Sequence, residues 1–324
     1  MRLLSPALLT AAALVLAACG TTEAADPAAP APAAGGPVTV TDARGKAVQL
    51  KAPAKKVVTL EWAEAEMVAT LGVMPVGVAD TAGYKTWDTA VPLDASVTDV
   101  GKRQEPSVDA IVALGPDVVI MAEERDSTLV PQLEKYVPVV VTEGSDAARN
   151  MERLRSDFTI IAQTLGKTAE AERVLSEMDT VLADGRKAVE GAGALGTPFL
   201  MADGWKEGST VSIRPFGKGS LVSDVAEAVG LENAYTGQVD AQWGLGQTDV
   251  EGLSSLTDPR TVLFYSASEE DVFTDGLAGN PLWDRLPFVE SGKITKFAAG
   301  TWTFGGPRSV QVIAEQVVKA VTAG

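Results

Sequence analysis

The stretch 146-DAARNMERLRSDFTIIAQTLG-166 separates two halves of the chain. Its apolar residues recur at spacings of three and four and so share one face of a helix: Met151, Leu154, Phe158, Ile161 and Leu165. We predict a helix over 147–165 that Asp146 caps and Gly166 ends. A helix of about twenty residues spans about 30 Å, which would make it a rigid strut between two lobes. Periodicity alone leaves open the alternative that this helix and the one after it are two ordinary cover helices of one larger sheet.

A second helical pattern follows and ends before Gly191, so a helical segment over 146–190 lies between two blocks, 38–145 and 191–324. In both blocks short apolar runs alternate with helical patterns, which is typical of α/β proteins whose parallel sheets are covered on both faces. The predicted helices of the first block include 63–71, 107–114 and 129–136. The predicted strands are 57–60, 75–79, 117–121, 137–142, 199–201, 261–266 and 294–297. We therefore predict an α/β protein of two lobes with mostly parallel sheets.

The first 37 residues are predicted to be a signal peptide followed by a flexible tether. Arg2 precedes an apolar run over 7–18. This run is too short to span a membrane, which takes about twenty residues, and matches the apolar region of a signal peptide. It ends Leu16-Ala17-Ala18-Cys19, which looks like the lipobox of bacterial lipoproteins. We predict a signal peptide over 1–18, lipid on Cys19 and a flexible Ala/Pro/Gly tether over 19–37. The alternative is a secreted protein with a chance cysteine.

Composition excludes several classes of protein. The 324 residues carry 43 Asp and Glu against 27 Lys and Arg, a net charge of −16, with one Cys and no His. Phosphate contacts need clustered basic residues, so nucleic-acid binding is disfavoured. Catalysis through His and internal disulfides are excluded. A site made of carboxylates alone stays open, although we interpret the two acidic clusters as solvated helix ends: Glu61, Glu64 and Glu66, and Glu123, Glu124 and Asp126.

Tryptophans stand in loops rather than in periodic apolar segments. Trp62 follows a predicted strand, Trp87 lies beside Tyr84 in a turn-rich segment, and Trp243 and Trp302 lie in glycine-rich stretches. Loop tryptophans that follow strands are well placed to line a cleft, so four together predict an aromatic pocket. We interpret Trp205 and Trp283 as structural.

Arg103 lies in a loop just before a predicted helix. Its planar fork of donors suits an anionic or oxygen-rich ligand. Composition alone favours the alternative of a surface arginine in an ion pair.

Seven short motifs follow one another along the body of the chain: LEW at 60–62, GVADT at 77–81 with Trp87 behind it, VGKRQEPSVD at 100–109, FGKGSL at 216–221, GLENA at 230–234, NPLWDRLP at 280–287 and TWTFGGPRS at 301–309. Each is weak alone. In this order they resemble the substrate-binding proteins of bacterial ABC importers for iron–siderophore complexes, most of all the ferric-hydroxamate-binding proteins. The resemblance implies two α/β lobes joined by one long rigid helix, with the ligand in a shallow cleft between them.

The resemblance also implies residue roles. Arg103 would donate hydrogen bonds to hydroxamate oxygens around Fe³⁺. Trp87, Trp243 and Trp302 would pack against the aliphatic arms of the siderophore, with Trp62 and Tyr84 as further candidates. The chelator fills the coordination sphere, so the protein would hold no metal directly, need no cofactor and catalyse no reaction.

Two positions depart from the family pattern. The family often has a Tyr after the strand that matches 117–121, and this chain has Ala122-Glu-Glu-Arg-Asp126 there. Arg125 is the candidate replacement. Phe304 stands where a Tyr hydroxyl can occur. A catecholate complex with three negative charges is disfavoured, since one or two arginines would have to balance it within an acidic protein.

The resemblance further implies a monomer that docks on an ABC permease dimer with its ATPase through one exposed carboxylate per lobe, by position Asp109 and Glu251. The protein would be extracytoplasmic and anchored to the bacterial cell membrane by lipid. Cobalamin and haem are alternative ligands of the same fold, and haem is disfavoured because His is absent. From other classes, a carboxylate- or metal-dependent extracytoplasmic hydrolase and a structural surface lipoprotein stay open.

Overall fold

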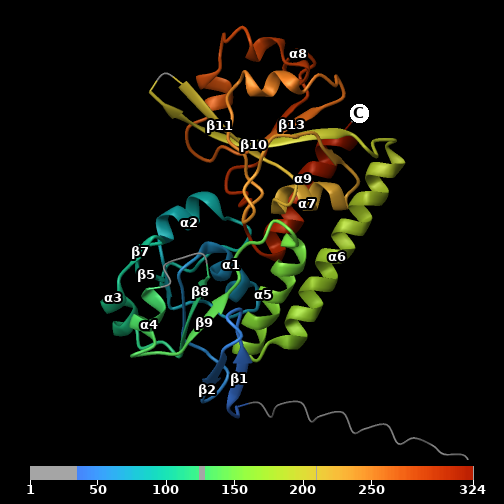
Figure 1. Cartoon of the computed structure of the whole chain (residues 1–324). Helices are drawn as coiled ribbons and strands as arrows, with labels where there is room; N and C mark the ends of the chain where they lie inside the picture. Colours follow the sequence, from blue (N-terminus) through green and yellow to red (C-terminus); the bar gives the residue numbers. More distant parts are fainter. Residues whose placement is uncertain (1–34, 124–127, 209, 324) are drawn as a thin grey trace, which may run out of the picture. The chain divides into compact units, whose positions relative to one another are not determined.

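The structure is a computed structural model that describes residues 35–123, 128–208 and 210–323. These residues belong to one compact unit (Figure 1). The predicted signal peptide, Cys19 and most of the predicted tether lie outside the described residues, as does Arg125. Within the described part, no helix has the length and apolar character needed to cross a membrane.

The N-terminal lobe is built on a five-stranded sheet in the order β5-β4-β3-β8-β9, and all of its pairings are parallel. Strands β8 (VVIMA) and β9 (VVVT) are buried at every position, as expected of a parallel sheet covered on both faces. The elements of this lobe are β1 (Val38–Thr41), β2 (Ala47–Leu50), β3 (Val57–Thr59), α1 (Trp62–Thr70), β4 (Gly77–Val78), α2 (Thr81–Trp87), β5 (Thr98–Asp99), β6 (Gly101–Lys102), β7 (Glu105–Pro106), α3 (Val108–Ala113), β8 (Val118–Ala122), α4 (Leu129–Leu133) and β9 (Val139–Thr142).

The C-terminal lobe has a second five-stranded sheet in the order β11-β10-β13-β14, with β12 also paired to β10. Its pairings are parallel except for the antiparallel hairpin of β10 and β11. The prediction of two lobes with mostly parallel sheets is therefore confirmed. The elements are β10 (Pro198–Glu207), β11 (Thr210–Phe216), α7 (Leu221–Ala228), β12 (Glu232–Asn233), η1 (Gly252–Ser255), β13 (Val262–Tyr265), η2 (Val272–Gly276), η3 (Trp283–Arg285), α8 (Pro287–Glu290), β14 (Ile294–Lys296) and α9 (Pro307–Thr322).

Along the chain, two helices follow the N-terminal sheet and precede the C-terminal one: α5 (Asn150–Leu165) and α6 (Thr168–Gly191). Helix α5 begins three residues later than predicted, because the Asp146 carboxylate accepts from the Ala148 N–H in a preceding turn rather than from the helix. It ends as predicted at Gly166, which adopts the left-handed conformation with φ of 65°.

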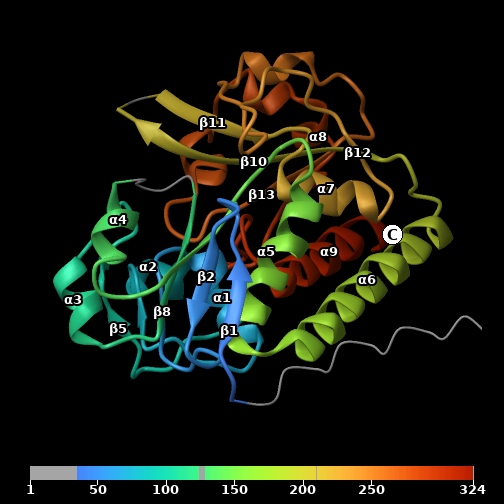
Figure 2. The same ribbon diagram turned by 60° about the horizontal axis from the view of Figure 1, so that its bottom comes forward.

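The helix predicted to join the two lobes, over 147–165, is not the one that does so. Helix α5 packs mainly against β1 and α1, with a smaller contact to α7, and so covers chiefly the N-terminal lobe. Helix α6 is the one that runs from the end of α5 to β10, packing along α9 and α7 on the way (Figures 1 and 2). At 24 residues it is about 36 Å long. One long helix joins the lobes, but it is the second of the pair.

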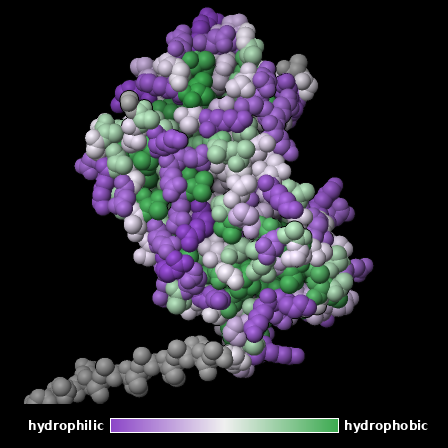
Figure 3. Space-filling view, turned by 180° about the vertical axis from the view of Figure 1, so that it is seen from behind, coloured by the Kyte–Doolittle hydropathy of each residue, from purple (hydrophilic) through white to green (hydrophobic). Residues whose placement is uncertain are grey.

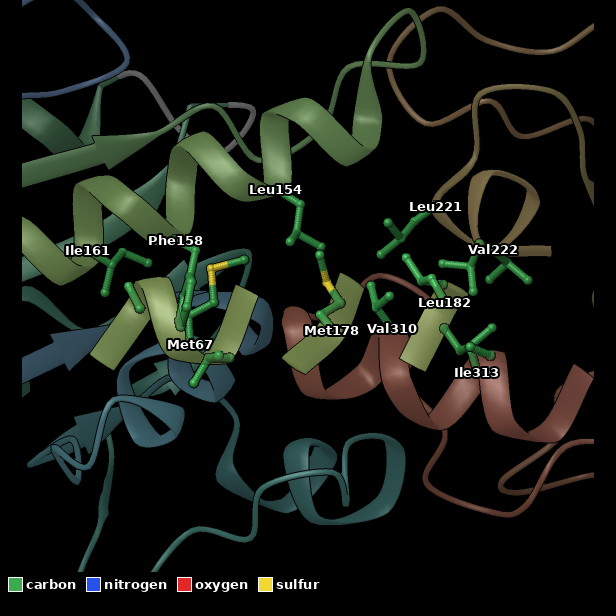
Figure 4. Close-up of a cluster of buried hydrophobic side chains, with 14 of the residues drawn as sticks. Met67, Leu154, Phe158, Ile161, Met178, Leu182, Leu221, Val222, Val310 and Ile313 are labelled. Carbon is green, nitrogen blue, oxygen red and sulfur yellow. The ribbon is translucent and has the colours of Figure 1, made fainter. Parts of the chain in front are cut away.

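One hydrophobic cluster continues through both lobes along α6. Figure 4 shows its side chains following one another along this helix, from Met67, Phe158 and Ile161 at one end to Leu221, Val222 and Ile313 at the other. Such a continuous core opposes hinge motion at this joint, because bending would separate close-packed side chains. Outside the core, hydrophilic residues cover much of the surface, with apolar residues between them, as Figure 3 shows for one face.

Candidate functional site

A cavity of about 280 Å³ is lined by residues from both lobes. The N-terminal lobe contributes Glu61, Ala63, Glu64, Arg103 and Gly144, and the C-terminal lobe contributes Arg214, Trp243, Leu245, Trp302 and Phe304. Arg103, Trp243, Trp302 and Phe304 were predicted from the sequence to bind ligand, and the structure brings them together in this one cavity.

The N-terminal side of the cavity lies at the carboxyl ends of the parallel strands, where open α/β sheets bind their ligands. Glu61 lies just beyond β3, at the N-cap of α1. Arg103 lies in the tight turn between β6 and β7, and Gly101, the first residue of β6, has φ of 103°. A side chain on Gly101 would crowd the backbone of residues 105–107, so glycine permits this turn and the placement of Arg103.

The guanidinium of Arg103 is held by a carboxylate and an aromatic ring. Its Nη1 donates to Glu61 Oε2 at 2.9 Å. Its Cζ lies 3.8 Å from the centre of the Trp62 ring and 5.6 Å from that of Trp302, both within range of a cation–π interaction. Arg103 is thus both the ion-paired arginine that composition favoured and a cavity residue that the resemblance implied.

Arg214 lines the same cavity from the C-terminal lobe, and it was not predicted from the sequence. It lies on β11 directly across from Asp203 on β10, and its Nε donates to Asp203 Oδ1 at 2.8 Å. Burial raises the pKa of Asp203, against the effect of Arg214. The available signal was that Arg214 is the one charged residue of the strand TVSIRPF, and a charged side chain is rarely buried in a strand without a partner.

Aromatic rings form the C-terminal wall of the cavity. The Phe304 ring centre lies 5.1 Å from that of Trp302, 5.4 Å from that of Trp243 and 5.5 Å from that of Phe216. Trp302 also meets Trp62 edge-on at 4.8 Å. These contacts hold the rings in tilted and edge-to-face geometries typical of stable aromatic pairs.

Three predicted ligand residues lie outside the cavity lining. Tyr84 is fully buried, and its hydroxyl donates to the Val91 carbonyl at 2.7 Å, so this prediction is corrected: the side chain is structural. Trp87 packs on the buried cluster that contains Trp62 and Tyr84, away from the lining. Trp62 is buried too, with its indole N–H donating to the carbonyls of residues 79 and 80. The Arg103 guanidinium stacks on the Trp62 ring.

The two tryptophans interpreted as structural differ from each other. Trp283 is buried in the core of the C-terminal lobe. Trp205 is 39% exposed on the β10–β11 hairpin, and its ring centre lies 5.8 Å from the Arg214 guanidinium.

The acidic cluster at α1 is not a solvated helix end. Glu61, Glu64 and Glu66 are all buried. Glu64 accepts from the Thr142 hydroxyl at 2.7 Å, and Glu66 accepts from four groups at the start of α9. The interpretation failed because it considered only the local helix, whereas the partners lie far away in the sequence. Of the second cluster, Glu123 is exposed and the others lie outside the described residues.

The two predicted docking carboxylates are both exposed. Asp109 lies in the first turn of α3, in the N-terminal lobe, and Glu251 immediately precedes η1, in the C-terminal lobe. Their placement leaves both available to a protein partner, one on each lobe.

The cavity combines two kinds of surface. Arg103 and Arg214 supply fixed N–H donors for an oxygen-rich group, while Trp243, Leu245, Trp302 and Phe304 supply apolar contact area. Among the described residues, no group of three or more Asp, Glu or Cys side chains is arranged to hold a metal ion. The arrangement suits noncovalent capture of a ligand with a polar centre and apolar arms.

The chain is similar to known binding proteins over most of its length. It is 28% identical to the iron(3+)-hydroxamate-binding protein FhuD of Escherichia coli over 262 residues, covering 78% of this chain and 82% of that protein. It is 30% identical to the Fe(3+)-citrate-binding protein YfmC of Bacillus subtilis over 290 residues, covering 86% of this chain and 84% of that protein.

A solved structure agrees with these relatives. The siderophore binding protein FhuD of Vibrio cholerae, bound to Fe³⁺-Desferal, has a TM-score of 0.73 and 26% identity, and the match covers 83% of this chain and 98% of that one. The sequence model of the family described as periplasmic binding protein matches residues 57–298, which include both sheets and Arg103, Arg214 and Trp243. The chain therefore belongs to the periplasmic binding protein family, as its motifs predicted.

Proposed function

We propose that this protein captures a ferric siderophore of the hydroxamate type in the cavity between its lobes and delivers it to an ABC importer. It is a binding protein rather than an enzyme, and it acts outside the cytoplasm, as members of its family do. The observation that carries the proposal is the convergence of Arg103 and Arg214 with Trp243, Trp302 and Phe304. Similarity to the iron(3+)-hydroxamate-binding protein FhuD of Escherichia coli and to FhuD of Vibrio cholerae, bound to Fe³⁺-Desferal, supports the hydroxamate class.

The charges of the cavity favour a ligand without large net charge. Two arginines, Arg103 and Arg214, share the lining with two glutamates, Glu61 and Glu64, so the formal charges of the lining side chains cancel. A ferric trihydroxamate is neutral at its metal centre and still offers oxygen acceptors to the guanidinium groups. A catecholate complex with three negative charges would enter a protein of net charge −16 without compensation from the cavity.

Iron need not touch the protein. The sequence has no His, and a hexadentate chelator leaves no open position on Fe³⁺. The protein then recognises the shell of the complex: guanidinium donors meet the oxygen-rich metal centre, and aromatic rings meet the aliphatic linkers.

Membrane anchoring is part of the proposal. Lipid on Cys19 and the segment 19–37, rich in Ala, Pro and Gly, would tether the binding unit close to a permease. Two relatives carry lipoprotein in their names, YhfQ and YfiY of Bacillus subtilis, which supports the anchor.

Ligand titration followed by tryptophan fluorescence tests the function. Trp243 and Trp302 line the cavity, so a bound ferric complex should quench their emission. We expect saturable quenching by ferric ferrioxamine or a ferrichrome-type complex, and weaker or no saturation by a catecholate complex or cobalamin. Gallium complexes serve as controls for nonspecific absorption by iron.

Other outcomes of the titration are informative. Saturation by ferric citrate alone would replace the hydroxamate with the ligand named for YfmC. Saturation by none of these chelates would reject the function, and cobalamin alone would move the protein to another ligand class of the same fold.

Docking through Asp109 and Glu251 predicts a separation of uptake from binding. Reversing both charges, Asp109→Arg with Glu251→Arg, should abolish siderophore uptake in cells, because arginines of a permease would meet like charges. Ligand affinity should stay within about twofold of the unmodified protein, since both residues lie outside the cavity.

A matched control reverses two exposed carboxylates of α6, Glu172→Arg with Glu190→Arg. It makes the same change in net charge and should retain uptake. Loss of affinity in the Asp109/Glu251 variant, or equal loss of uptake in the control, would contradict the docking role.

A further inference from the structure

Glu66 makes an unusual connection between α1 and the start of α9. Its side chain is 0% exposed. Its carboxylate accepts from the backbone N–H groups of Gly306, Arg308 and Ser309 at 2.7, 3.0 and 3.0 Å, and from the Ser309 hydroxyl at 2.6 Å. The residues joined in this way stand about 240 positions apart in the sequence.

The start of α9 needs an external cap. Helix N-termini leave N–H groups without partners inside the helix, and the N-cap residue of α9 is Gly306, which has no side chain to offer. Pro307 follows at the first helical position, where its missing N–H costs nothing. The negative charge of Glu66 also suits the positive end of the helix dipole.

Two glycines make room for this carboxylate. A Cβ on Gly305 would lie 2.5 Å from Glu66 Oε2, and a Cβ on Gly306 would lie 2.8 Å from Met67 Cγ. The sequence Phe304-Gly-Gly-Pro307 therefore lets the backbone approach α1 closely. Burial raises the pKa of Glu66, although the four donors oppose this shift. The ionised carboxylate is therefore destabilised by desolvation and stabilised by its four hydrogen bonds.

The segment 300–306, which leads to α9, is also hydrogen-bonded to the N-terminal lobe at its start. The N–H and hydroxyl of Thr89 both donate to the Gly300 carbonyl, at 2.9 and 3.1 Å. Residues 300–306 follow β14 of the C-terminal lobe in the chain. They carry Trp302 and Phe304, which both belong to the C-terminal wall of the cavity. The ring of Trp302 then rests on Trp62, the first residue of α1.

We propose that Glu66 is a positioning residue of the binding cavity, which locks the aromatic segment 301–304 onto α1. It touches no ligand. By joining α1 to the start of α9, it sets the distance between the N-terminal wall, with Glu61 and Arg103, and the C-terminal wall, with Trp302 and Phe304. This inference rests on the proposed function for its effect on affinity, but its structural part can be measured without ligand.

The test compares Glu66→Gln with a matched buried carboxylate, Asp42→Asn. Asp42 is also buried and accepts from the backbone N–H groups of Arg44, Lys46 and Val141. It lies in the turn of the β1–β2 hairpin, where the Arg44 guanidinium also pairs with it, and outside the cavity. Glutamine keeps the shape of Glu66 but turns an amide donor toward N–H groups that need acceptors. All variants are compared at a temperature where far-ultraviolet circular dichroism shows them folded.

The first measurement is the exciton circular dichroism of the Trp62–Trp302 pair, which depends on the mutual orientation of the two rings and is assigned by its loss in Trp302→Phe. We expect Glu66→Gln to lose most of this signal and about tenfold in affinity for ferric ferrioxamine. Asp42→Asn should retain both, even if it lowers stability. If folded Glu66→Gln keeps signal and affinity, or Asp42→Asn loses them equally, the proposal is overturned.

A milder variant covers the case in which Glu66→Gln does not fold. Ser309→Ala removes only the hydroxyl donor to Glu66 and should weaken the exciton signal partially, in the same direction. An unchanged signal in folded Ser309→Ala would then overturn the proposal. If the unmodified protein binds no hydroxamate, the proposed function fails, while the exciton comparison still decides whether Glu66 orients the aromatic segment.

Discussion

Replacing Arg103 with alanine is expected to weaken the binding of a ferric hydroxamate by about 10- to 150-fold. Hydrogen bonds to charged groups contribute about 1.5–3 kcal/mol, and each 1.4 kcal/mol is a factor of ten in affinity. Arg103 is well prepared for this role, because Glu61 and the Trp62 ring hold its guanidinium in place before ligand arrives. Little side-chain entropy is then lost on binding.

Two controls separate the role of Arg103 from its charge. Arg103→Lys keeps a positive charge but loses the planar fork, so we expect an affinity between those of the unmodified protein and Arg103→Ala. Arg155→Ala removes a half-buried arginine of α5 outside the cavity and should leave the dissociation constant unchanged. Titration by fluorescence quenching measures all three. A loss smaller than about threefold in Arg103→Ala would remove Arg103 from the binding site.

Replacing Asp157 with alanine is expected to lower the free energy of unfolding by about 3–5 kcal/mol, because it leaves a buried charge without its counterion. Asp157 and Arg153 lie one turn apart on α5, with side chains 1% and 3% exposed. The Asp157 carboxylate also accepts from the N–H groups of Glu143 and Gly144 at 2.9 and 3.1 Å. These donors would lose their partner as well.

The same helix provides the matched comparison. Arg155 pairs with Asp179 on α6 at the surface, and exposed pairs contribute about 0–1 kcal/mol. Asp179→Ala should therefore change the stability by less than about 1 kcal/mol. Urea unfolding followed by circular dichroism measures both variants. Equal losses in the two would show that burial does not set the strength of these pairs.

Site prediction succeeded where ligand residues stand in loops after strands and failed where the three-dimensional path of the chain decides. Trp243 and Trp302 were predicted from their glycine-rich loops and line the cavity. Tyr84 and Trp87 were predicted in a turn-rich segment, but both lie on helix α2, where Tyr84 is buried and Trp87 packs, partly buried, against the same cluster. Turn-rich composition therefore did not exclude a short helix, and it did not indicate which way the side chains point.

Pairing across the chain explains the other misses. Glu66 lies among acidic residues at a helix start, where a solvated role is usual, and its donors come from residues 306–309. Arg214 needed Asp203 opposite it on the β10–β11 hairpin. In both cases the chemical role depends on a partner that only folding brings near.

The sequence by itself determined the α/β class, most parallel strands and the stop of α5 at Gly166, because these follow from burial patterns and backbone preferences that are local in the chain. Family membership came instead from the resemblance of its seven ordered motifs. The tertiary structure alone decided that α6 rather than α5 joins the lobes, that Arg103 and Arg214 face one cavity, and that Glu66 caps α9. The physical reason is that amphipathic periodicity shows that a helix has a buried face, but not which surface covers it, and hydrogen-bond partners of buried charges are chosen by the packed fold.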